Sequence, residues 1–447
     1  MNYEEAVRYL LSLGRELAAP TQAAAAKFNL ENITVLLERL GRPDRAFPTV
    51  HIAGTNGKGS TAAFLESILR DAGFRTGLNT SPHLERLNER IRIGGEEISD
   101  ELFAETFTRV YGVLEQLLAE GKLRAHPTYF ECVTAVAFEA FARERVDFAV
   151  IEVGLGGRLD ATNIITPVVS VVTRIDFDHE NFLGHSLREI AGEKAGILKH
   201  GVPVVIAEQY PEAREVLLQR AAELYCPVTE PAAVFQVDNE RMEDGCVRAT
   251  VSAVGGARTY ELKPQLRGQF QLKNAMNAVA VTQVLQDRGY QVSRGNIERG
   301  IAATEWPGRL ERLQERPDVY LDGAHNPGAA RELARFLEEN FQERKVFMVF
   351  GAMRDKAVDE VTGMLFPHAF EVLFTAPRNP RAIGAEQLAE MAGHHAGKYS
   401  VHADAEEAME AAMAKAGSGD AVFITGSLYL VGQLRQAWKE RGKVASK

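Results

Sequence analysis

The sequence predicts an α/β protein in which a P-loop domain, built on a doubly wound and mostly parallel sheet, precedes a smaller Rossmann-like α/β domain. Short, nearly continuous apolar runs alternate with longer amphipathic segments, as in parallel sheets that helices cover on both faces. A glycine-rich segment, residues 54–61, joins the first such run to a helix-like segment. The 447 residues also exceed what one hydrophobic core usually supports. We therefore expect two domains, residues 1–300 and 301–447.

The first predicted domain carries the larger sheet. Two of its segments, Thr128–Arg145 and Gln271–Gly289, have the length and periodicity of helices. Residues 226–263 alternate valine, threonine, glycine and charged side chains without a helical period, which predicts a small antiparallel excursion. The strands expected in this domain are Thr49–Ala53, Phe148–Val153, Val168–Thr173 and Val202–Ala207.

The second predicted domain repeats the alternation of strand and helix after a boundary near Ile301. Its expected strands are Val319–Leu321, Val346–Phe350, Val372–Phe374 and Ala421–Ile424.

Composition excludes several classes of protein. The net charge is −10 and the basic residues are dispersed, which argues against nucleic acid as a partner. Three scattered cysteines form no disulfide framework and fit a reducing compartment. The first residues lack a signal-peptide pattern, and no apolar run approaches the ~18–20 residues of a membrane helix. We expect a cytoplasmic enzyme that binds no membrane.

The glycine-rich segment is the strongest functional signal. Glycines let successive backbone N–H groups converge on phosphate oxygens, and a lysine can reach the outer phosphates. A strict P-loop would have glycine at Ile52 and a hydroxyl at Gly59, so the match is partial. The residues predicted to bind ATP here are Gly54, Thr55, Asn56, Gly57, Lys58, Gly59 and Ser60.

Carboxylates and a histidine follow two of the expected strands. Glu152 ends one strand beside the predicted phosphate site, where a magnesium ligand is needed. A glutamate that simply faces solvent at the end of a strand would give the same sequence pattern. Asp178 and His179 follow the next strand, but a lone histidine is as often structural as functional. Lys194 lies in an apolar helical stretch, and its spacing does not distinguish a buried lysine from one that extends to solvent.

Several motifs together resemble the folylpolyglutamate synthase and dihydrofolate synthase family of the Mur-ligase superfamily. They occur in family order from residue 51 to about residue 330. The segment after them fits the family's second domain without a comparably specific motif. The motifs are Gly54–Thr61, Ser81–Leu84, Glu89–Ile91, Thr128–Glu131, Glu152–Asn163, Asp178–His179, Glu193–Lys194, Trp306–Arg309 and Asp322–Pro327.

The resemblance implies a site for ATP and two Mg²⁺ ions. Residues matching Ser81 and Glu152 ligate magnesium in the family, and a histidine matching His179 serves the second ion. The lysine matching Lys194 is typically carbamylated, which turns a cation into a carboxylate-like ligand. An unmodified ammonium group would repel Mg²⁺, so the modification accounts for a lysine near the metals.

The resemblance also assigns residues that face the nucleotide from the rest of the chain. Asn274 and Arg309 match positions that contact ATP. Asp322, His325 and Asn326 match residues that face the nucleotide across the cleft between the domains, although Asp322-Gly323 and Asn326-Pro327 are strong turn formers by themselves. The predicted catalytic set is Lys58, His179, Lys194, Asp322 and His325.

The implied reaction is ATP-dependent amide formation through an acyl phosphate that L-glutamate attacks. The acceptor is a folate, and we favour a bifunctional enzyme that also accepts dihydropteroate, whose flat rings Tyr129 and Phe130 could contact. We expect a monomer with small-molecule partners. Two alternatives stay open: a different Mur-type ligase acting on a cell-wall nucleotide precursor, and a nucleotide-dependent switch without ligase chemistry.

Overall fold

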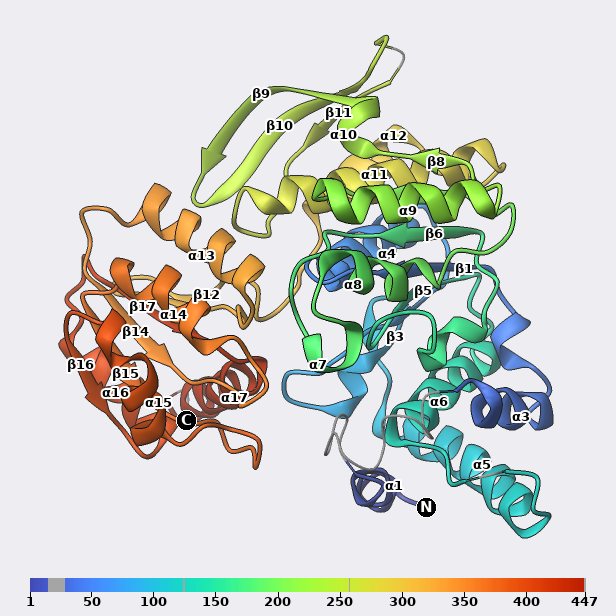
Figure 1. The fold of residues 1–447 in the computed structure, drawn as a ribbon, viewed down its shortest axis with the longest axis horizontal. Coiled ribbons are helices and arrows are strands. Elements are labelled where there is room, and N and C mark those ends of the chain that lie inside the picture. The colour runs from blue at the N-terminus through green and yellow to red at the C-terminus, as the bar shows by residue number, and fades with distance from the viewer. Residues whose placement is uncertain (15–28, 124, 257, 446–447) are drawn as a thin grey trace.

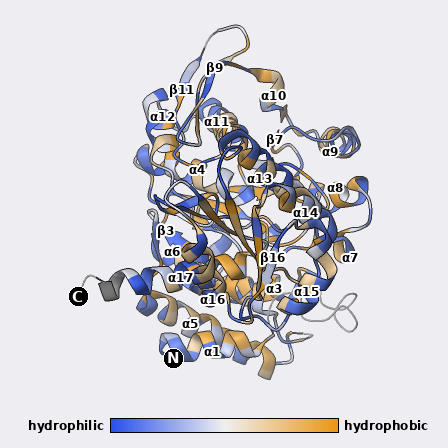
Figure 2. Cartoon of the chain, turned by 90° about the vertical axis from the view of Figure 1, so that its left-hand side faces the viewer, coloured by the Kyte–Doolittle hydropathy of each residue, from blue (hydrophilic) through white to orange (hydrophobic). Residues whose placement is uncertain are grey.

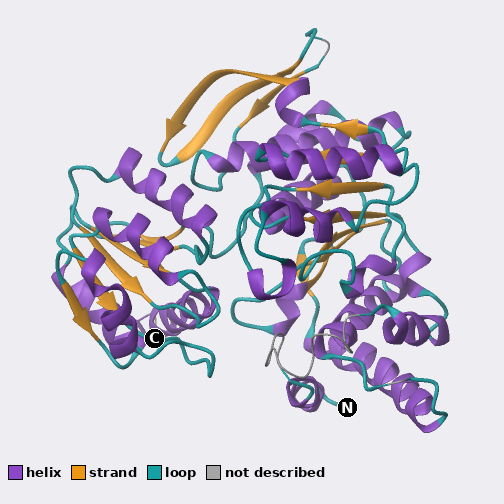
Figure 3. Ribbon diagram, in the orientation of Figure 1, coloured by secondary structure: helices purple, strands orange, loops and turns teal. Residues whose placement is uncertain are grey.

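A computed structural model describes residues 1–14, 29–123, 125–256 and 258–445, and places them around two separate sheets (Figure 1). Helices flank each sheet, as Figure 3 shows. Among the described residues, no helix has the length and apolar character that crossing a membrane would require.

The first sheet has eight strands. They are β1 (Thr49–Ala53), β2 (Thr76–Asn79), β3 (Ile91–Ile93), β4 (Glu96–Glu97), β5 (Phe148–Glu152), β6 (Val169–Val172), β7 (Val204–Ile206) and β8 (Val228–Thr229). Their order is β4-β3-β2-β5-β1-β6-β7-β8, with only the β2–β3 and β3–β4 pairs antiparallel. All four strands expected in this domain are present, and the sheet is doubly wound and mostly parallel as predicted.

Helices cover both faces of this sheet. They are α1 (Tyr3–Ser12), α3 (Glu31–Arg39), α4 (Lys58–Asp71), α5 (Asp100–Ala119), α6 (Tyr129–Arg143), α7 (Glu180–Leu183), α8 (Leu187–Ala195), α9 (Pro211–Glu223), α10 (Pro231–Val234), α11 (Phe270–Asp287) and α12 (Arg294–Ala302). One buried cluster joins α4, α11 and α12 to the sheet, and another joins α1, α3, α5 and α6 to its other face. Burial on both faces explains why its central strands β1, β5 and β6 are mostly apolar and wholly buried. Figure 2, which looks at the molecule from the side of the second sheet, shows apolar strands at the centre.

An antiparallel ribbon projects from the first sheet's domain. It consists of β9 (Phe235–Glu243), β10 (Cys246–Ala253) and β11 (Thr259–Leu262). This is the excursion that residues 226–263 predicted, except that β8 at its start joins the main sheet. Figure 1 shows the ribbon reaching over the gap toward the second sheet.

The second sheet has six strands in the order β12-β13-β17-β14-β15-β16. The strands are β12 (Glu311–Gln314), β13 (Asp318–Leu321), β14 (Val346–Phe350), β15 (Glu371–Phe374), β16 (Tyr399–Val401) and β17 (Ala421–Thr425). Its helices are α13 (Pro327–Asn340), α14 (Val358–Leu365), α15 (Ala385–Ala392), α16 (Ala405–Lys415) and α17 (Leu428–Ala445). Only β12 pairs antiparallel, so this half is the smaller Rossmann-like unit that the sequence predicts.

Candidate active site

The phosphate cradle joins β1 to α4 through a turn that requires glycine. Gly54 has a φ of 149°, and a Cβ there would lie 1.9 Å from Thr173 Oγ1. Gly57 has a φ of 84°, and a Cβ there would lie 2.3 Å from Asn274 Oδ1. Gly57 is also the N-cap of α4, and among the described residues no side chain caps it. The first N–H groups of a 14-residue helix therefore face the site, where an anion is favoured.

Gly59, where a strict P-loop has a hydroxyl, lies against Trp306. A Cβ at Gly59 would be 2.9 Å from Trp306 Nε1. The indole also lies under the Arg92 guanidinium, 5.5 Å from the ring centroid. The departure from the strict P-loop is therefore a packing requirement, because the chain that connects the two sheets passes directly over the start of α4.

Two lysines converge on one carbonyl of the cradle. Lys58 Nζ donates to the Gly54 carbonyl at 3.1 Å and to the Thr55 carbonyl at 3.2 Å. Lys194 Nζ donates to the same Gly54 carbonyl at 2.9 Å. Lys58 thus folds back on its own turn and is positioned to exchange these carbonyls for phosphate oxygens.

Lys194 is buried and does not extend to solvent, so the alternative of an exposed lysine is wrong. Only 4% of the residue is exposed. Burial, reinforced by the positive charge of Lys58, lowers the pKa of Lys194 to about 7. A large fraction of this amine is therefore neutral at physiological pH, unlike an ordinary lysine.

Glu152 lies at the end of β5, at the same sheet edge. It is 5% exposed, and its Oε2 accepts a hydrogen bond from the Ser81 backbone N–H at 3.1 Å. Burial raises the pKa of Glu152, and the nearby Lys58 charge opposes that rise. A buried carboxylate beside one backbone donor and one ammonium group favours a further cation, so Glu152 is not the solvent-facing acid that the sequence left open.

Asp178 and His179 connect this edge to the second sheet. Lys356 Nζ lies 2.6 Å from Asp178 Oδ1, and both side chains are nearly buried. Burial by itself would raise the pKa of Asp178, but a hydrogen bond from His325 and the Lys356 charge hold that pKa well below its usual range. Burial lowers the pKa of His179 to about 4. Its Nδ1 is buried without a hydrogen-bond partner among the described residues, so a neutral imidazole nitrogen remains available there.

Sequence reasoning missed Lys356 and gave Asp178 no role of its own. Lys356 follows β14 in a short loop after Gly351. Its position beyond the carboxyl end of an expected strand was the available signal, since open α/β sheets bind ligands there.

The turn after β13 faces the cradle. Asp322 accepts hydrogen bonds from the backbone N–H groups of Leu310 and Ala324, both at 2.9 Å. Burial raises the pKa of Asp322, which the charge of Arg309 counteracts. Asn326 caps α13 through Oδ1, and its amide nitrogen donates to Asn56 Oδ1 at 3.0 Å and Asp178 Oδ2 at 3.1 Å. Asp322 and Asn326 therefore do stabilise the turn, as the sequence alternative held, and Asn326 also contacts the first half.

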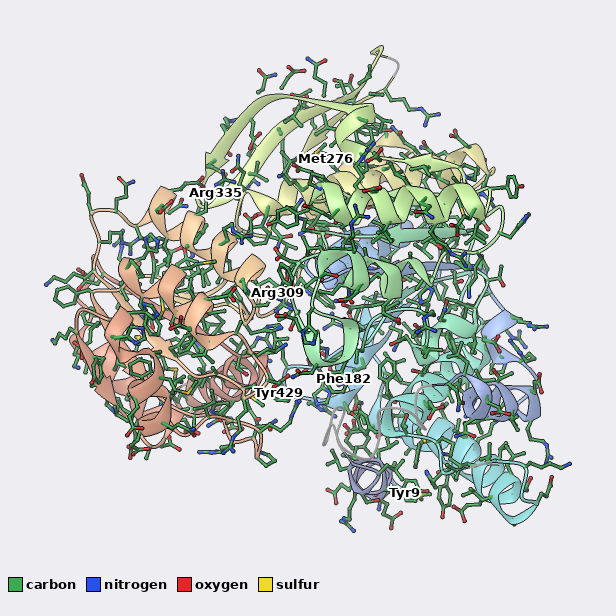
Figure 4. The ribbon with its side chains drawn as sticks, in the orientation of Figure 1. Tyr9, Phe182, Met276, Arg309, Arg335 and Tyr429 are labelled. Carbon is green, nitrogen blue, oxygen red and sulfur yellow. The ribbon has the colours of Figure 1, made fainter. Side chains whose placement is uncertain are left out.

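All predicted site residues line one cavity of about 670 Å³ between the two sheets. Arg309 lies between the two halves in Figure 4, and Met276 and Arg335 approach the same space from α11 and α13. Asn274 also lines it and donates to Gln271 Oε1 at 2.9 Å, while the buried Gln271 lies 3.4 Å from Ser60 Oγ. Tyr129, by contrast, packs in the core at 5% exposure, and only Phe130 stays half-buried, against Gly154.

Comparison with known proteins agrees with this geometry. Residues 52–282 match the Mur ligase middle domain, and residues 308–428 match the Mur ligase glutamate ligase domain. The dihydrofolate synthase/folylpolyglutamate synthase of Bacillus subtilis is 36% identical over 92% of this chain and 95% of its own length.

Solved structures lead to the same family. The folylpolyglutamate synthase of Mycobacterium tuberculosis, complexed with ADP and AMPPCP, superimposes with a TM-score of 0.88 at 33% identity, over 97% of this chain and 99% of that one. FolC of E. coli, in complex with DHPP and ADP, gives 0.85 at 31% identity over 99% and 98%. The chain belongs to the dihydrofolate synthase/folylpolyglutamate synthase family of Mur ligases.

Proposed function

We propose that this protein is an ATP-dependent ligase that joins L-glutamate to a folate, and also to dihydropteroate, through an acyl phosphate. The observation that carries the proposal is the contact between the two halves at the cavity. Asn326, at the start of α13, donates to Asn56 of the phosphate cradle and to Asp178. A nucleotide held by the first half therefore lies within reach of residues from the second, as a two-substrate ligation requires.

The cradle binds the phosphates of ATP, and Lys58 has the main electrostatic role. On binding, its ammonium group exchanges the carbonyls of Gly54 and Thr55 for the outer phosphate oxygens. Charge then accumulates on the transferring phosphoryl group, and a fixed cation in a site with little water stabilises that charge strongly. Asn274 and Arg309 line the cavity as further nucleotide contacts.

The residues at the first sheet's edge fit Mg²⁺, and we assign Ser81, Glu152, His179 and Lys194 to hold two ions. The fit rests on the buried Glu152 carboxylate and on the buried, unpartnered Nδ1 of His179. When bound, the ions neutralise phosphate charge and orient the phosphoryl group for in-line transfer.

The neutral amine of Lys194 fits carbamylation. The nitrogen lone pair attacks the carbon of CO₂, and an N–C bond forms as one C=O π bond breaks and its electron pair moves to oxygen. The nitrogen then loses one proton to water, which leaves a carbamate anion. Only the neutral amine reacts in this way, and the pKa of about 7 makes it abundant. The product would place beside Lys58 an anion that both Lys58 and the metals favour.

The second half closes the site. We propose residues 1–300 and 301–447 as the two domains, with Asp322 and His325 facing the nucleotide from the second. Closure excludes water that would otherwise hydrolyse the acyl phosphate. The enzyme is expected to act as a monomer in the cytoplasm, where ATP and glutamate are available.

The test measures product mass. The purified enzyme is incubated with ATP, Mg²⁺, glutamate and either tetrahydrofolate or dihydropteroate, with Lys58→Ala as a control. The proposal expects each acceptor to gain one glutamate residue and Lys58→Ala to give no product. A gain by tetrahydrofolate alone would limit the enzyme to folylpolyglutamate synthesis. ATP hydrolysis without an amide product from either acceptor would contradict the proposal and favour a nucleotide-dependent switch.

A further inference from the structure

A second group of metal-ligating side chains lies on the second half of the chain, apart from the residues that line the active-site cavity. It comprises Asp359, in the first turn of α14, and His394 and His395, in the short 3₁₀ helix η5 (Gly393–His395) that follows α15. The three ligand atoms all lie within 4.8 Å of one another. We name this group the α14–η5 cluster.

Its geometry is that of a site for a small divalent ion. Asp359 Oδ1 lies 2.9 Å from His395 Nε2 and 3.5 Å from His394 Nε2. Zinc binds imidazole nitrogen and carboxylate oxygen at about 2.0–2.2 Å in a tetrahedron, which places neighbouring ligand atoms about 3.3 Å apart. The two measured separations bracket that value.

The local fold keeps both imidazoles together. His394 and His395 are adjacent in a single 3₁₀ turn, and their ring centroids lie only 3.9 Å apart, with 41° between the planes. His395 also packs near Gly363 of α14, where a Cβ would lie 3.5 Å from its ring. Two imidazoles that share one carboxylate repel each other if both are protonated, whereas a metal ion keeps both neutral and binds all three groups.

We propose that the α14–η5 cluster binds one divalent transition-metal ion of the Zn²⁺ class. Two imidazoles and one carboxylate make a nitrogen-rich donor set, which suits Zn²⁺, Ni²⁺ or Cu²⁺ and not the oxygen-preferring Mg²⁺ of the active site. Asp359 is 77% exposed and His394 60%, so water completes the coordination. The ion would connect the first turn of α14 to the segment that precedes β16.

The ordinary alternative is a surface ion pair between Asp359 and the histidines. Such a pair contributes little to stability and needs no metal. The two alternatives differ in what they expect from added zinc, so metal binding distinguishes them directly.

The experiment measures Zn²⁺ binding by tag-free full-length enzyme saturated with Mg–AMPPCP, so that the active site is occupied. Titration calorimetry and metal analysis should find one Zn²⁺ per chain. The variant with both His394→Ala and His395→Ala should bind it more than about 10-fold more weakly. His368→Ala is the matched control, because His368 also faces a carboxylate, Glu338 at 3.7 Å, without a second histidine ligand.

A zinc-soaked crystal locates the ion independently of affinity. Anomalous scattering at the zinc edge should give a peak between Asp359, His394 and His395. Equal zinc binding by the double variant and the wild type, or an anomalous peak elsewhere with none at the cluster, would overturn the proposal. The double variant should keep its ligase activity, because none of its changed residues lines the catalytic cavity.

Discussion

Two strand-to-helix turns face each other across the cavity, and they differ in how they treat the unpaired backbone N–H groups at the start of the helix. The turn from β1 to α4 is built from glycines, and its N-cap Gly57 offers no side chain. The turn from β13 to α13 is built from Asp322 and Asn326, whose side chains bind the N–H groups of their own and neighbouring turns.

The difference determines what each turn presents to the cavity. The glycine turn leaves helix N–H groups for an external anion. The Asp/Asn turn satisfies its own donors, so it contributes rigid side chains instead, such as the amide nitrogen of Asn326. In the proposed function, the first turn binds phosphate and the second positions groups against the bound phosphate.

The largest effect expected is that of Lys58→Ala. It removes the ammonium group that the glycine turn holds at the phosphates, and we expect a loss of kcat/KM of about 10³-fold or more. Steady-state assays with both acceptors measure it. Lys398→Ala is the control, since Lys398 pairs with Glu371 and is 59% exposed. Turnover near the wild-type rate in Lys58→Ala would exclude this loop as the phosphate site.

Lys194→Met should separate catalysis from stability. Activity should fall by about 10²-fold or more, because Met cannot form a carbamate. Stability in CO₂-free buffer should nevertheless rise, because Met needs no hydration. The pKa falls from 10.5 to about 7 on folding, so between these values the unfolded wild type binds more protons and its stability increases with pH.

The stability advantage of Lys194→Met is therefore largest below pH 7 and disappears above about pH 10.5. Thermal unfolding at pH 6, 8 and 10 measures it. An active Lys194→Met enzyme, or an advantage that grows with pH, would contradict this account of the buried amine.

The cradle, the strands named in advance and the excursion were predictable because their signals are local, whereas β2, β8 and β16 were not expected as strands. Glycine spacing, apolar runs and the carboxyl ends of strands are all present within short windows. The burial of Lys194 was not predictable from the sequence, because it depends on the contact between α8 and the loop after β5. Gly157 allows that contact, since a Cβ there would lie 2.8 Å from the Glu193 carbonyl oxygen.

The Lys356–Asp178 pair could not be predicted either, because its members are distant in the sequence. They are 178 residues apart, and they lie in loops that follow strands of different sheets. No periodicity connects them, and only the relative placement of the two sheets brings them together. The short antiparallel strands β3, β4 and β12 were missed for a different reason. The strand β4 has two residues and no apolar side chain, β3 alternates apolar and charged residues over only 3 positions, and β12 (Glu-Arg-Leu-Gln) has a single apolar residue.

Gly57→Ala tests the requirement for glycine in the cradle. It combines a positive φ with a Cβ 2.3 Å from Asn274 Oδ1, so we expect about 10²-fold weaker activity as the turn and Asn274 shift. Gly289→Ala is the matched control, because its φ is 92° and nothing lies within 4 Å of a Cβ there. That control should lose only about 1 kcal/mol of stability. Equal activity in the two variants would mean that the cradle does not require glycine at position 57.

The smallest effect concerns the loop after β14, which contacts the first half beside the Asp/Asn turn. Lys356→Ala removes the 2.6 Å ion pair with Asp178, while the hydrogen bond from Asn326 to that carboxylate remains. Since the two halves stay in contact through Asn326, we expect kcat to fall only about 10-fold, with little change in AMPPCP affinity. Asp178→Asn should lose more, because it weakens the contacts of both Lys356 and His325. Lys345→Ala, which changes a lysine that lies over the Phe370 ring, controls for loss of charge. If Lys356→Ala lowered kcat and nucleotide affinity equally, the Lys356 side chain would act in binding the nucleotide and not in holding the two halves together.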